Sequence, residues 1–275
     1  MAMDVTLLGT GSPIPTPDRA GPSTLVRVAG RDFLVDCGRG VLMRLAGAMG
    51  SPTTLSMVLL THLHSDHTTD LNDVITSRWA MSPFPNPLTI VGPPGTMQFV
   101  DRTMTMLTDD IGYRIAHHAD LNEPPRVEVV EIHDGVVLDE GGVRITAAPT
   151  DHAPVHPTVG YRFEHDGAVV AIAGDTVPCE GLDRICAGAD IYVQTVIRPD
   201  IIEQIPMPRL QDVMDYHSSV ADAGRTAASA GVTTLLLTHP VPPPAPGTDD
   251  EWTALAAAHF DGTVVLGVDL FTAST

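Results

Sequence analysis

Residues 57–67 read M-V-L-L-T-H-L-H-S-D-H, and from this stretch we predict both the fold and the chemistry. The apolar run that ends at Leu60 is typical of a buried strand. Four residues of metal-binding type follow it within six positions: His62, His64, Asp66 and His67. In an extended segment, residues two apart point the same way, so His62 and His64 can reach one ion together. Asp66 and His67 can serve a second ion nearby, and the alternative is a polar loop that is merely rich in histidine.

Three more candidate ligands follow later strand-like runs. Asp151-His152 comes after Val143–Ala147, Gly174-Asp175 after Val169–Ala173, and Thr238-His239 after Thr234–Leu237. The carboxyl ends of strands are where α/β folds build their sites, so we expect these side chains to join the first cluster. Together the candidates supply seven ligands, enough for two ions that share a carboxylate.

Short β-branched runs alternate with amphipathic helical stretches along the rest of the chain. Further strands are expected at Val5–Leu8, Thr24–Val28, Phe33–Val35, Leu88–Val91, Val127–Ile132, Val159–Phe163, Ile191–Val193 and Val264–Leu266. Helices are expected at Val41–Met49, Thr69–Ala80, Thr96–Thr108, Val220–Ala230 and Glu251–His259. The pattern predicts sheets covered by helices on their outer faces. We expect a single domain over residues 1–275, built as two halves of roughly 1–120 and 121–275.

The charge of the chain is strongly acidic. Its 275 residues include 34 acidic and 15 basic side chains, which gives a formal net charge of −19, and every basic residue is an arginine. Proteins that bind nucleic acid usually carry a basic surface. The composition therefore argues against a long RNA lying across the surface and against an anionic membrane. Two divalent ions would place positive charge in one cleft, where a small anionic substrate could still bind.

The H-L-H-S-D-H stretch at residues 62–67 is the H-x-H-x-D-H signature of the metallo-β-lactamase superfamily, which the chain resembles. The resemblance implies a four-layer αββα sandwich of two mixed β-sheets with outer helices, covering nearly the whole chain. It also implies the ligand sets: His62, His64 and His152 for one ion, Asp66, His67 and His239 for the other, and Asp175 as the bridge between them. The expected ions are two Zn²⁺, with Mn²⁺ or Fe²⁺ as alternatives.

Finer motifs resemble the ribonuclease Z branch, including ribonuclease Z-like proteins of actinobacteria. They are L-L-G-T-G-S-P at Leu7–Pro13, V-D-C-G at Val35–Gly38, G-D-T-V-P-C at Gly174–Cys179 and Y-H-S-S at Tyr216–Ser219. The resemblance implies a phosphodiesterase in which a hydroxide between two ions attacks phosphorus. Asp66 would orient the hydroxide, and His217 would be the general acid for the leaving oxygen. We expect Ser12 and Ser218 to contact substrate.

Three departures from that branch bear on the substrate. Only 22 residues separate His152 from Asp175, where the branch usually inserts an arm that grips tRNA. Gln194–Ile197 stands in place of a His-Glu-Ala-Thr motif whose glutamate supports the catalytic histidine, and Arg39 replaces a common glutamate. The first two departures argue against tRNA 3′ processing. They favour a small phosphodiester over a tRNA precursor, and an RNA 3′ end is the other candidate substrate.

Two other classes of function compete with the phosphodiesterase. One is a hydrolase of another ester class on the same fold, acting on a lactone, a thioester or an aryl sulfate, and a lactonase could use Tyr161 or Tyr216. The other is a metal-binding or RNA-binding scaffold without catalysis, which the full set of seven ligands disfavours. We assign His117 and His118 to a surface loop and His156 to a turn.

The remaining features concern the cellular setting. Residues 1–4 lack the charged and apolar pattern of a signal peptide, and no apolar run approaches 18 residues, so we expect no membrane association. Three cysteines are too few and too scattered for a disulfide framework. We therefore expect a cytoplasmic protein, and the resemblance suggests a homodimer.

Overall fold

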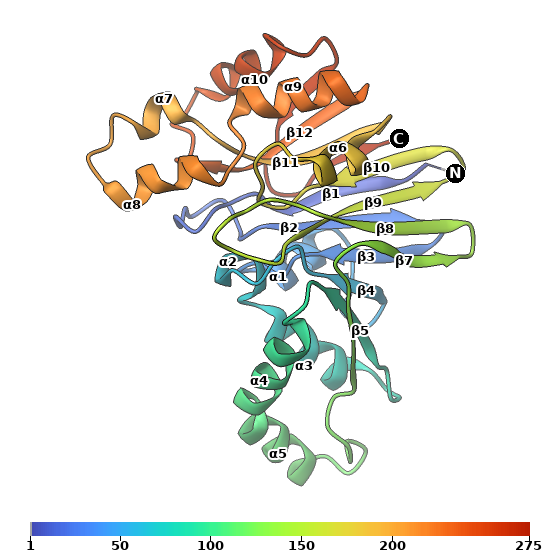
Figure 1. Cartoon of the computed structure of the whole chain (residues 1–275). Coiled ribbons are helices and arrows are strands. Elements are labelled where there is room, and N and C mark those ends of the chain that lie inside the picture. Colours follow the sequence, from blue (N-terminus) through green and yellow to red (C-terminus); the bar gives the residue numbers. More distant parts are fainter. Residues whose placement is uncertain (1) are drawn as a thin grey trace.

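The computed structural model describes residues 2–275 and contains two seven-stranded sheets packed face to face (Figure 1). The first sheet has the order β14-β1-β2-β3-β4-β5-β6 and consists of β1 (Asp4–Gly9), β2 (Ser23–Val28), β3 (Arg31–Val35), β4 (Leu55–Leu59), β5 (Leu88–Gly92), β6 (Val127–Glu131) and β14 (Phe271–Ser274). The second has the order β13-β12-β11-β10-β9-β8-β7 and consists of β7 (Gly135–Glu140), β8 (Val143–Pro149), β9 (Val159–His165), β10 (Ala168–Ile172), β11 (Ile191–Ile197), β12 (Thr234–Val241) and β13 (Thr263–Leu266). Both sheets mix parallel and antiparallel pairs.

Helices connect the strands and cover the outer faces of the sheets. The first half contains α1 (Val41–Gly47), α2 (Ser65–Thr68), α3 (Leu71–Met81), α4 (Thr96–Met106) and α5 (Thr108–His117). The second half contains α6 (Glu180–Cys186), α7 (Pro199–Ile202), α8 (Pro208–Gln211), the 3₁₀ helix η1 (Asp212–Asp215), α9 (Val220–Ala230) and α10 (Asp249–Ala257). Apolar residues of α1, α3 and α4 pack on the first sheet, and those of α6, α9 and α10 pack on the second.

Three apolar layers hold this arrangement together, because the central strands are buried on both faces. In β3, Phe33 and Val35 belong to the layer between the sheets, whereas Leu34 belongs to the layer beneath α1 and α3. Phe33 meets Phe163 of the second sheet edge-on, with ring centroids 5.9 Å apart. Burying one such side chain contributes about 1.5–3 kcal/mol to stability. The predicted αββα sandwich of two mixed sheets is confirmed, and its packed layers fix the loops at the strand ends.

The structure also differs from the predictions in three places. Residues 108–117 form α5 rather than a loop, so His117 ends a helix, although it and His118 are exposed as expected. β7 and β14 were not predicted, because neither is a long apolar run; β14 has only four residues, which alternate between half-buried and exposed. The chain passes from the first sheet to the second at residues 132–134, not near residue 120. Within residues 2–275, no helix is long and apolar enough to cross a bilayer.

Candidate metal centre

The loop after β4 carries four of the predicted ligands. His62 and His64 lie between β4 and α2, and α2 itself carries Asp66 and His67. β4 is a parallel strand between β3 and β5, so its carboxyl end opens at the edge of the sheet where α/β folds place their sites. His62 and His67 are buried, while His64 is partly exposed.

The second half supplies the other three predicted ligands from three separate places. Asp175 lies three residues after β10, and His152 lies three residues after β8. The prediction for His239 needs a correction, because β12 does not end at Leu237 but continues through Val241. His239 lies inside the strand with a left-handed φ of 52°, and its N–H donates to the Thr10 carbonyl at 3.1 Å. This local kink departs from the regular strand that the sequence suggests.

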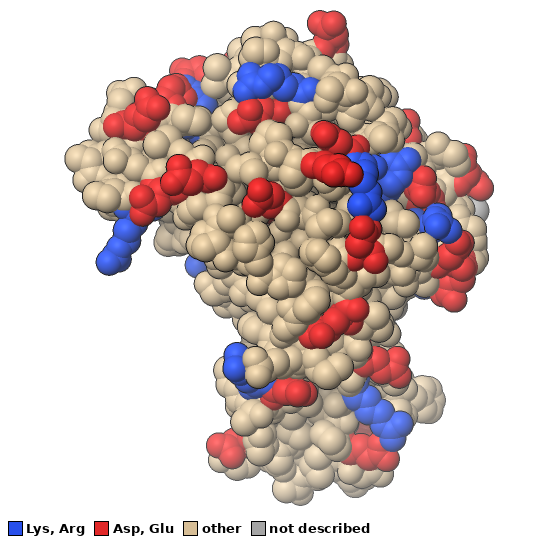
Figure 2. Space-filling view, viewed as in Figure 1, with Lys and Arg blue, Asp and Glu red and all other residues tan. Residues whose placement is uncertain are grey.

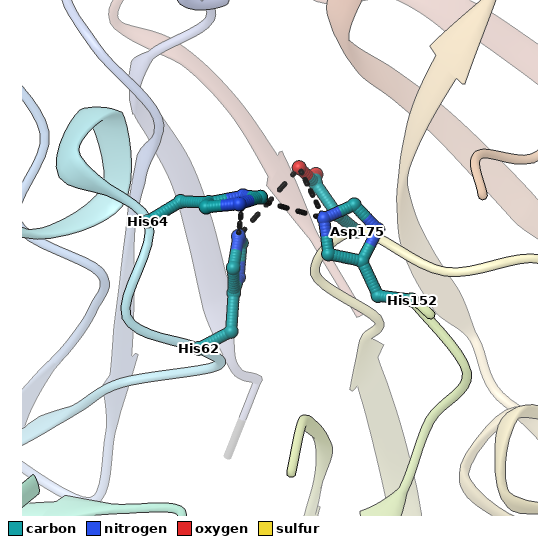
Figure 3. A group of neighbouring side chains, drawn as sticks. All are labelled: His62, His64, His152 and Asp175. Carbon is teal, nitrogen blue, oxygen red and sulfur yellow. Dashed lines mark hydrogen bonds and ion pairs between the residues drawn. The ribbon is translucent and has the colours of Figure 1, made fainter. Parts of the chain in front are cut away.

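One group of converging side chains contains His62, His64, His152 and Asp175 (Figure 3). His64 Nδ1 lies 3.1 Å from His62 Nε2 and 3.3 Å from His152 Nε2. Figure 3 shows the three rings pointing toward one another, with the Asp175 carboxylate beside them.

The second group contains Asp66, His67 and His239. Asp66 Oδ2 lies 3.1 Å from His239 Nε2 and 3.6 Å from His67 Nε2. His67 and His239 are buried, and the Asp66 side chain is 9% exposed. Apart from Asp175, the two groups differ in composition, since the first offers three histidines and the second offers two histidines with a carboxylate.

Asp175 joins the two groups. Its Oδ2 atom lies within 4 Å of a ring nitrogen of five histidines: His67 at 3.4 Å, His62 and His239 at 3.8 Å, His152 at 3.9 Å and His217 at 3.2 Å. A single carboxylate oxygen in this position is equidistant, within half an ångström, from ligand atoms of both groups. This is the placement expected of a bridging ligand.

The donor set fits divalent cations. Ligands about 2.1 Å from one ion in a tetrahedral arrangement lie roughly 3.4 Å from one another, close to the separations found here. Three buried atoms in the centre have no hydrogen-bond partner in the described chain: His67 Nε2, Asp175 Oδ1 and His239 Nδ1. An orphaned buried polar atom costs about 1–3 kcal/mol, and a bound ion would remove that cost for His67 Nε2 and Asp175 Oδ1; His239 turns its other nitrogen, Nε2, toward Asp66.

Asp36 holds one candidate ligand of each group in position. Its Oδ2 accepts hydrogen bonds of 2.8 Å from His67 Nδ1 and from the Thr61 hydroxyl, and its Oδ1 accepts from the Thr61 N–H. The Thr61 hydroxyl lies 3.0 Å from His62 Nδ1. The Asp36 bond places the proton on Nδ1 of His67 and leaves its Nε2 free for a metal. Sequence reasoning missed Thr61, because its role depends on its place between Asp36 and His62 in the folded chain.

In the second half, backbone carbonyls take over this supporting role. His152 Nδ1 donates to the Tyr216 carbonyl at 2.9 Å, and His217 Nδ1 donates to the Val213 carbonyl at 3.0 Å. Gln194, which occupies the start of the expected His-Glu-Ala-Thr motif, is buried and accepts from the Tyr192 hydroxyl. The motif's glutamate, which would support the catalytic histidine, is absent from this sequence. In its place, the main-chain oxygen of Val213 supports His217.

The electrostatics of the two groups differ. Burial lowers the pKa of His62 well below its usual range and that of His152 to about 4, which favours the neutral, metal-binding imidazole. Burial also lowers the pKa of His67 and His239, but the Asp175 carboxylate and its neighbours outweigh this and hold both values above the ordinary one. Burial raises the pKa of Asp175, yet the facing His239 and His67 hold it well below its usual range.

The two serines expected at the substrate site are both buried. The Ser218 hydroxyl donates to the Thr176 carbonyl at 2.7 Å, so it braces the loop around Asp175 and its proton is not free for a substrate. The Ser12 hydroxyl has no partner among the described residues, and its contact with substrate stays a prediction. His156 is exposed and lies two residues after the turn at 153–154.

A carboxylate near the end of the chain fixes the loop that carries Ser12. Asp269 Oδ1 accepts from the N–H and the hydroxyl of Thr10 at 2.9 and 2.7 Å. Its Oδ2 accepts from the Ala20 N–H at 2.7 Å and from Arg44 Nε at 2.8 Å. The Thr10 carbonyl in turn accepts from the His239 N–H. The hydrogen bonds of Asp269 are therefore linked, through Thr10, to a residue of the candidate metal centre.

Comparisons with known proteins agree with this architecture. A model of the β-lactamase superfamily domain matches residues 31–240. The ribonuclease Z of Mycolicibacterium paratuberculosis is 60% identical over 270 residues, which cover 98% of this chain and 96% of that protein.

Solved structures show the same fold at lower identity. The metallo-β-lactamase fold protein YhfI of Bacillus subtilis has a TM-score of 0.76 at 23% identity, and the match covers 100% of this chain and 99% of YhfI. The short form of human tRNase Z has a TM-score of 0.71 at 22% identity, covering 98% of both chains. With the family match, the high identity and the converging histidines and aspartates taken together, the chain belongs to the β-lactamase superfamily and, within it, to the ribonuclease Z family of metal-dependent hydrolases.

Proposed function

We propose that this protein is a dinuclear zinc-dependent phosphodiesterase that cleaves RNA at a 3′ end. One observation supports the proposal: seven candidate ligand residues form two groups, Asp175 of the first group lies within 4 Å of both histidines of the second, and the His217 imidazole lies against that same carboxylate. Two adjacent cation sites beside a proton donor suit the cleavage of a phosphodiester, because they can stabilise both the attacking and the leaving oxygen.

The residues that would hold the ions follow from the two groups. His62, His64 and His152 would hold one ion, Asp66, His67 and His239 the other, with Asp175 between them. When bound, such a pair activates water near neutral pH and stabilises the charge that develops on a phosphoryl group. Asp66, which lies against His239, would also orient the attacking water. Zinc is our choice because imidazole and carboxylate ligands suit it, with Mn²⁺ or Fe²⁺ as alternatives.

His217 would act as the general acid. A carbonyl oxygen can only accept, so the bond to Val213 places a proton on Nδ1 and turns Nε2 toward Asp175 and both groups. In its protonated form Nε2 would donate to the leaving alkoxide, which departs poorly without a proton. General acid catalysis of this kind typically contributes about 10²–10⁴-fold to the rate.

The missing arm between His152 and Asp175 bears on how large an RNA substrate the protein can bind. The segment between His152 and Asp175 holds β9, β10 and a turn, and no arm. The mycobacterial ribonuclease Z is matched over 96% of its length, so the missing arm does not set this chain apart from that protein. The net charge of −19 still favours a short RNA segment over a whole tRNA on the surface.

A panel of four substrates tests the proposal. Zinc-loaded protein is given an RNA with a 3′ trailer, bis(4-nitrophenyl) phosphate, a nitrophenyl sulfate and a homoserine lactone. We expect cleavage of the RNA and the phosphodiester, loss of activity with a chelator, and recovery with zinc. Hydrolysis of the lactone or the sulfate alone would overturn the proposal and support the other ester class. For that alternative, Tyr161 is buried and donates to the Leu60 carbonyl, which leaves Tyr216.

The cellular setting completes the proposal. We propose a cytoplasmic enzyme, supported by three cysteines that are all free. A homodimer stays a prediction, to be checked by light scattering of the purified protein.

A further inference from the structure

Most of the arginines in this protein are already occupied. Twelve of the fifteen guanidinium groups form an ion pair or a hydrogen bond: those of Arg19, Arg27, Arg31, Arg44, Arg78, Arg114, Arg126, Arg144, Arg162, Arg184, Arg198 and Arg225. Arg39, Arg102 and Arg209 are exposed, and within residues 2–275 their guanidinium groups have no such partner. In an acidic protein, these three are the cations still available to an anionic ligand.

Arg39 lies beside the second ligand group. The Cys37 N–H donates to the His67 carbonyl at 2.7 Å, and a Cβ atom on Gly38 would lie 2.6 Å from the Asp66 carbonyl oxygen. The Arg39 carbonyl itself accepts from the Gly21 N–H at 2.7 Å. The backbone at Arg39 is therefore fixed against the ligand loop, while its side chain is free. A rigid base with an unpaired cation suits binding, because little backbone order is lost when a ligand arrives.

Arg209 lies on the segment of the second half that leads to the proposed acid. It belongs to α8, four residues before Val213, whose carbonyl holds His217. The same segment ends at Tyr216, whose carbonyl holds His152. Figure 1 shows α7 and α8 projecting from the second sheet on the side of the sandwich where α2 lies.

The overall charge makes these two positions stand out. On the face drawn in Figure 2, most blue side chains border red ones, which agrees with the many ion pairs. Arg102, by contrast, lies in the seventh position of α4, in the lobe that extends away from α8 (Figure 1). Two of the three free arginines thus lie on segments whose backbone contacts residues of the candidate metal centre, and for Arg102 no such contact is found among the described residues.

We propose that Arg39 and Arg209 bind RNA phosphates on either side of the scissile bond; the inference rests on the proposed phosphodiesterase function. A guanidinium matches the geometry of a phosphate and forms strong, charge-assisted hydrogen bonds with it. An RNA strand carries phosphates on both sides of the bond that is cut, whereas bis(4-nitrophenyl) phosphate carries only the reacting one. The two arginines therefore select a polynucleotide over a small diester.

The test compares variants on both substrates. Arg39→Ala, Arg209→Ala, the double variant and the control Arg102→Ala are assayed, zinc-loaded, on an RNA with a 3′ trailer and on bis(4-nitrophenyl) phosphate, across a range of salt. Each single variant should lose about three- to tenfold in kcat/KM on RNA, mainly through KM, and so lower the ratio of RNA to diester activity. In a plot of log kcat/KM against log salt concentration, the magnitude of the negative slope should decrease by about 0.7 for each phosphate contact that is lost. Arg39→Lys should recover most of the salt slope, and Arg102→Ala should match the unaltered protein.

The outcomes separate this inference from the proposed function. If the unaltered protein cleaves RNA but the Arg39 and Arg209 variants keep its salt slope, or lose equally on both substrates, the inference alone is overturned. A loss with Arg102→Ala as large as with Arg39→Ala also overturns it, because general surface charge would then explain the effect. If the unaltered protein cleaves the small diester and no RNA, both the RNA function and this inference fail.

Discussion

The two halves of the molecule hold their metal-site histidines by different means. In the first half, the Asp36 carboxylate holds His67 directly and His62 through a threonine. In the second half, His152 and His217 donate to main-chain carbonyls at residues 216 and 213. A hydrogen bond to a charged group is roughly twice as strong as one between neutral groups. A single substitution of the charged side chain, however, removes that hydrogen bond. A carbonyl gives weaker support that survives any change of side chain.

The largest effect should come from the residue that joins the halves. Asp175→Asn keeps the shape of the side chain but removes the charge between the two groups. We expect bound zinc to fall from about two ions per chain and kcat/KM to fall more than about 10³-fold, because several kcal/mol of charge stabilisation is lost. Metal analysis and the phosphodiester assay measure this. Asp183→Asn, an exposed site on α6, is the control. Full metal content with activity within tenfold would contradict the bridging role.

The next effect concerns His217, the proposed general acid, whose ring is held by a main-chain carbonyl. His217→Ala should slow cleavage of RNA and alkyl phosphodiesters by roughly 10²-fold or more, and should slow nitrophenyl diesters far less, since nitrophenolate leaves without a proton. The two rates are compared on the same zinc-loaded preparation. Equal losses on both substrates would show that His217 does not donate the proton.

A smaller effect is expected from the carboxylate support in the first half. Asp36 has a left-handed φ of 62°, which asparagine also tolerates, so Asp36→Asn should keep the backbone and remove the charge. Losing such a supporting group typically weakens metal affinity by about 10–100-fold. Titration with a competing chelator measures the shift, and Asp32→Asn, on β3 just before Asp36, is the control. An unchanged chelator midpoint would refute the role assigned to Asp36.

The smallest effect should come from the carbonyl support. Val213→Ala keeps the main-chain oxygen that holds His217 and removes only two methyl groups from a half-buried side chain. We expect kcat/KM on RNA to fall by less than about threefold, well below the loss for His217→Ala. A loss as large as that of His217→Ala would mean that the valine side chain, not its carbonyl, orients the imidazole.

This contrast also explains how much the sequence could reveal. The run from His62 to His67 was predictable because ligand types gather directly after an apolar strand. His152 and Asp175 were predictable from their places after strands, and the structure brings both to the same centre. The carbonyls that hold His152 and His217 carry no signal, because every residue has one. The kink that turns His239 inward was equally hidden, since it depends on a bond to Thr10, far away in the chain.

β14 determines whether a protein cleaved near its C-terminal strand stays in solution. It covers β1 at the edge of the first sheet, pairing Asp4 with Ser274 and Leu7 with Phe271. β14 itself is a short, half-exposed edge, whereas five of the six residues of β1 are buried. A protein nicked after Leu270 would keep all seven ligand residues but leave the hydrogen-bonding groups of an apolar strand unpaired. Such an edge recruits strands from other molecules, so we expect the nicked protein to precipitate with its metal-binding residues intact.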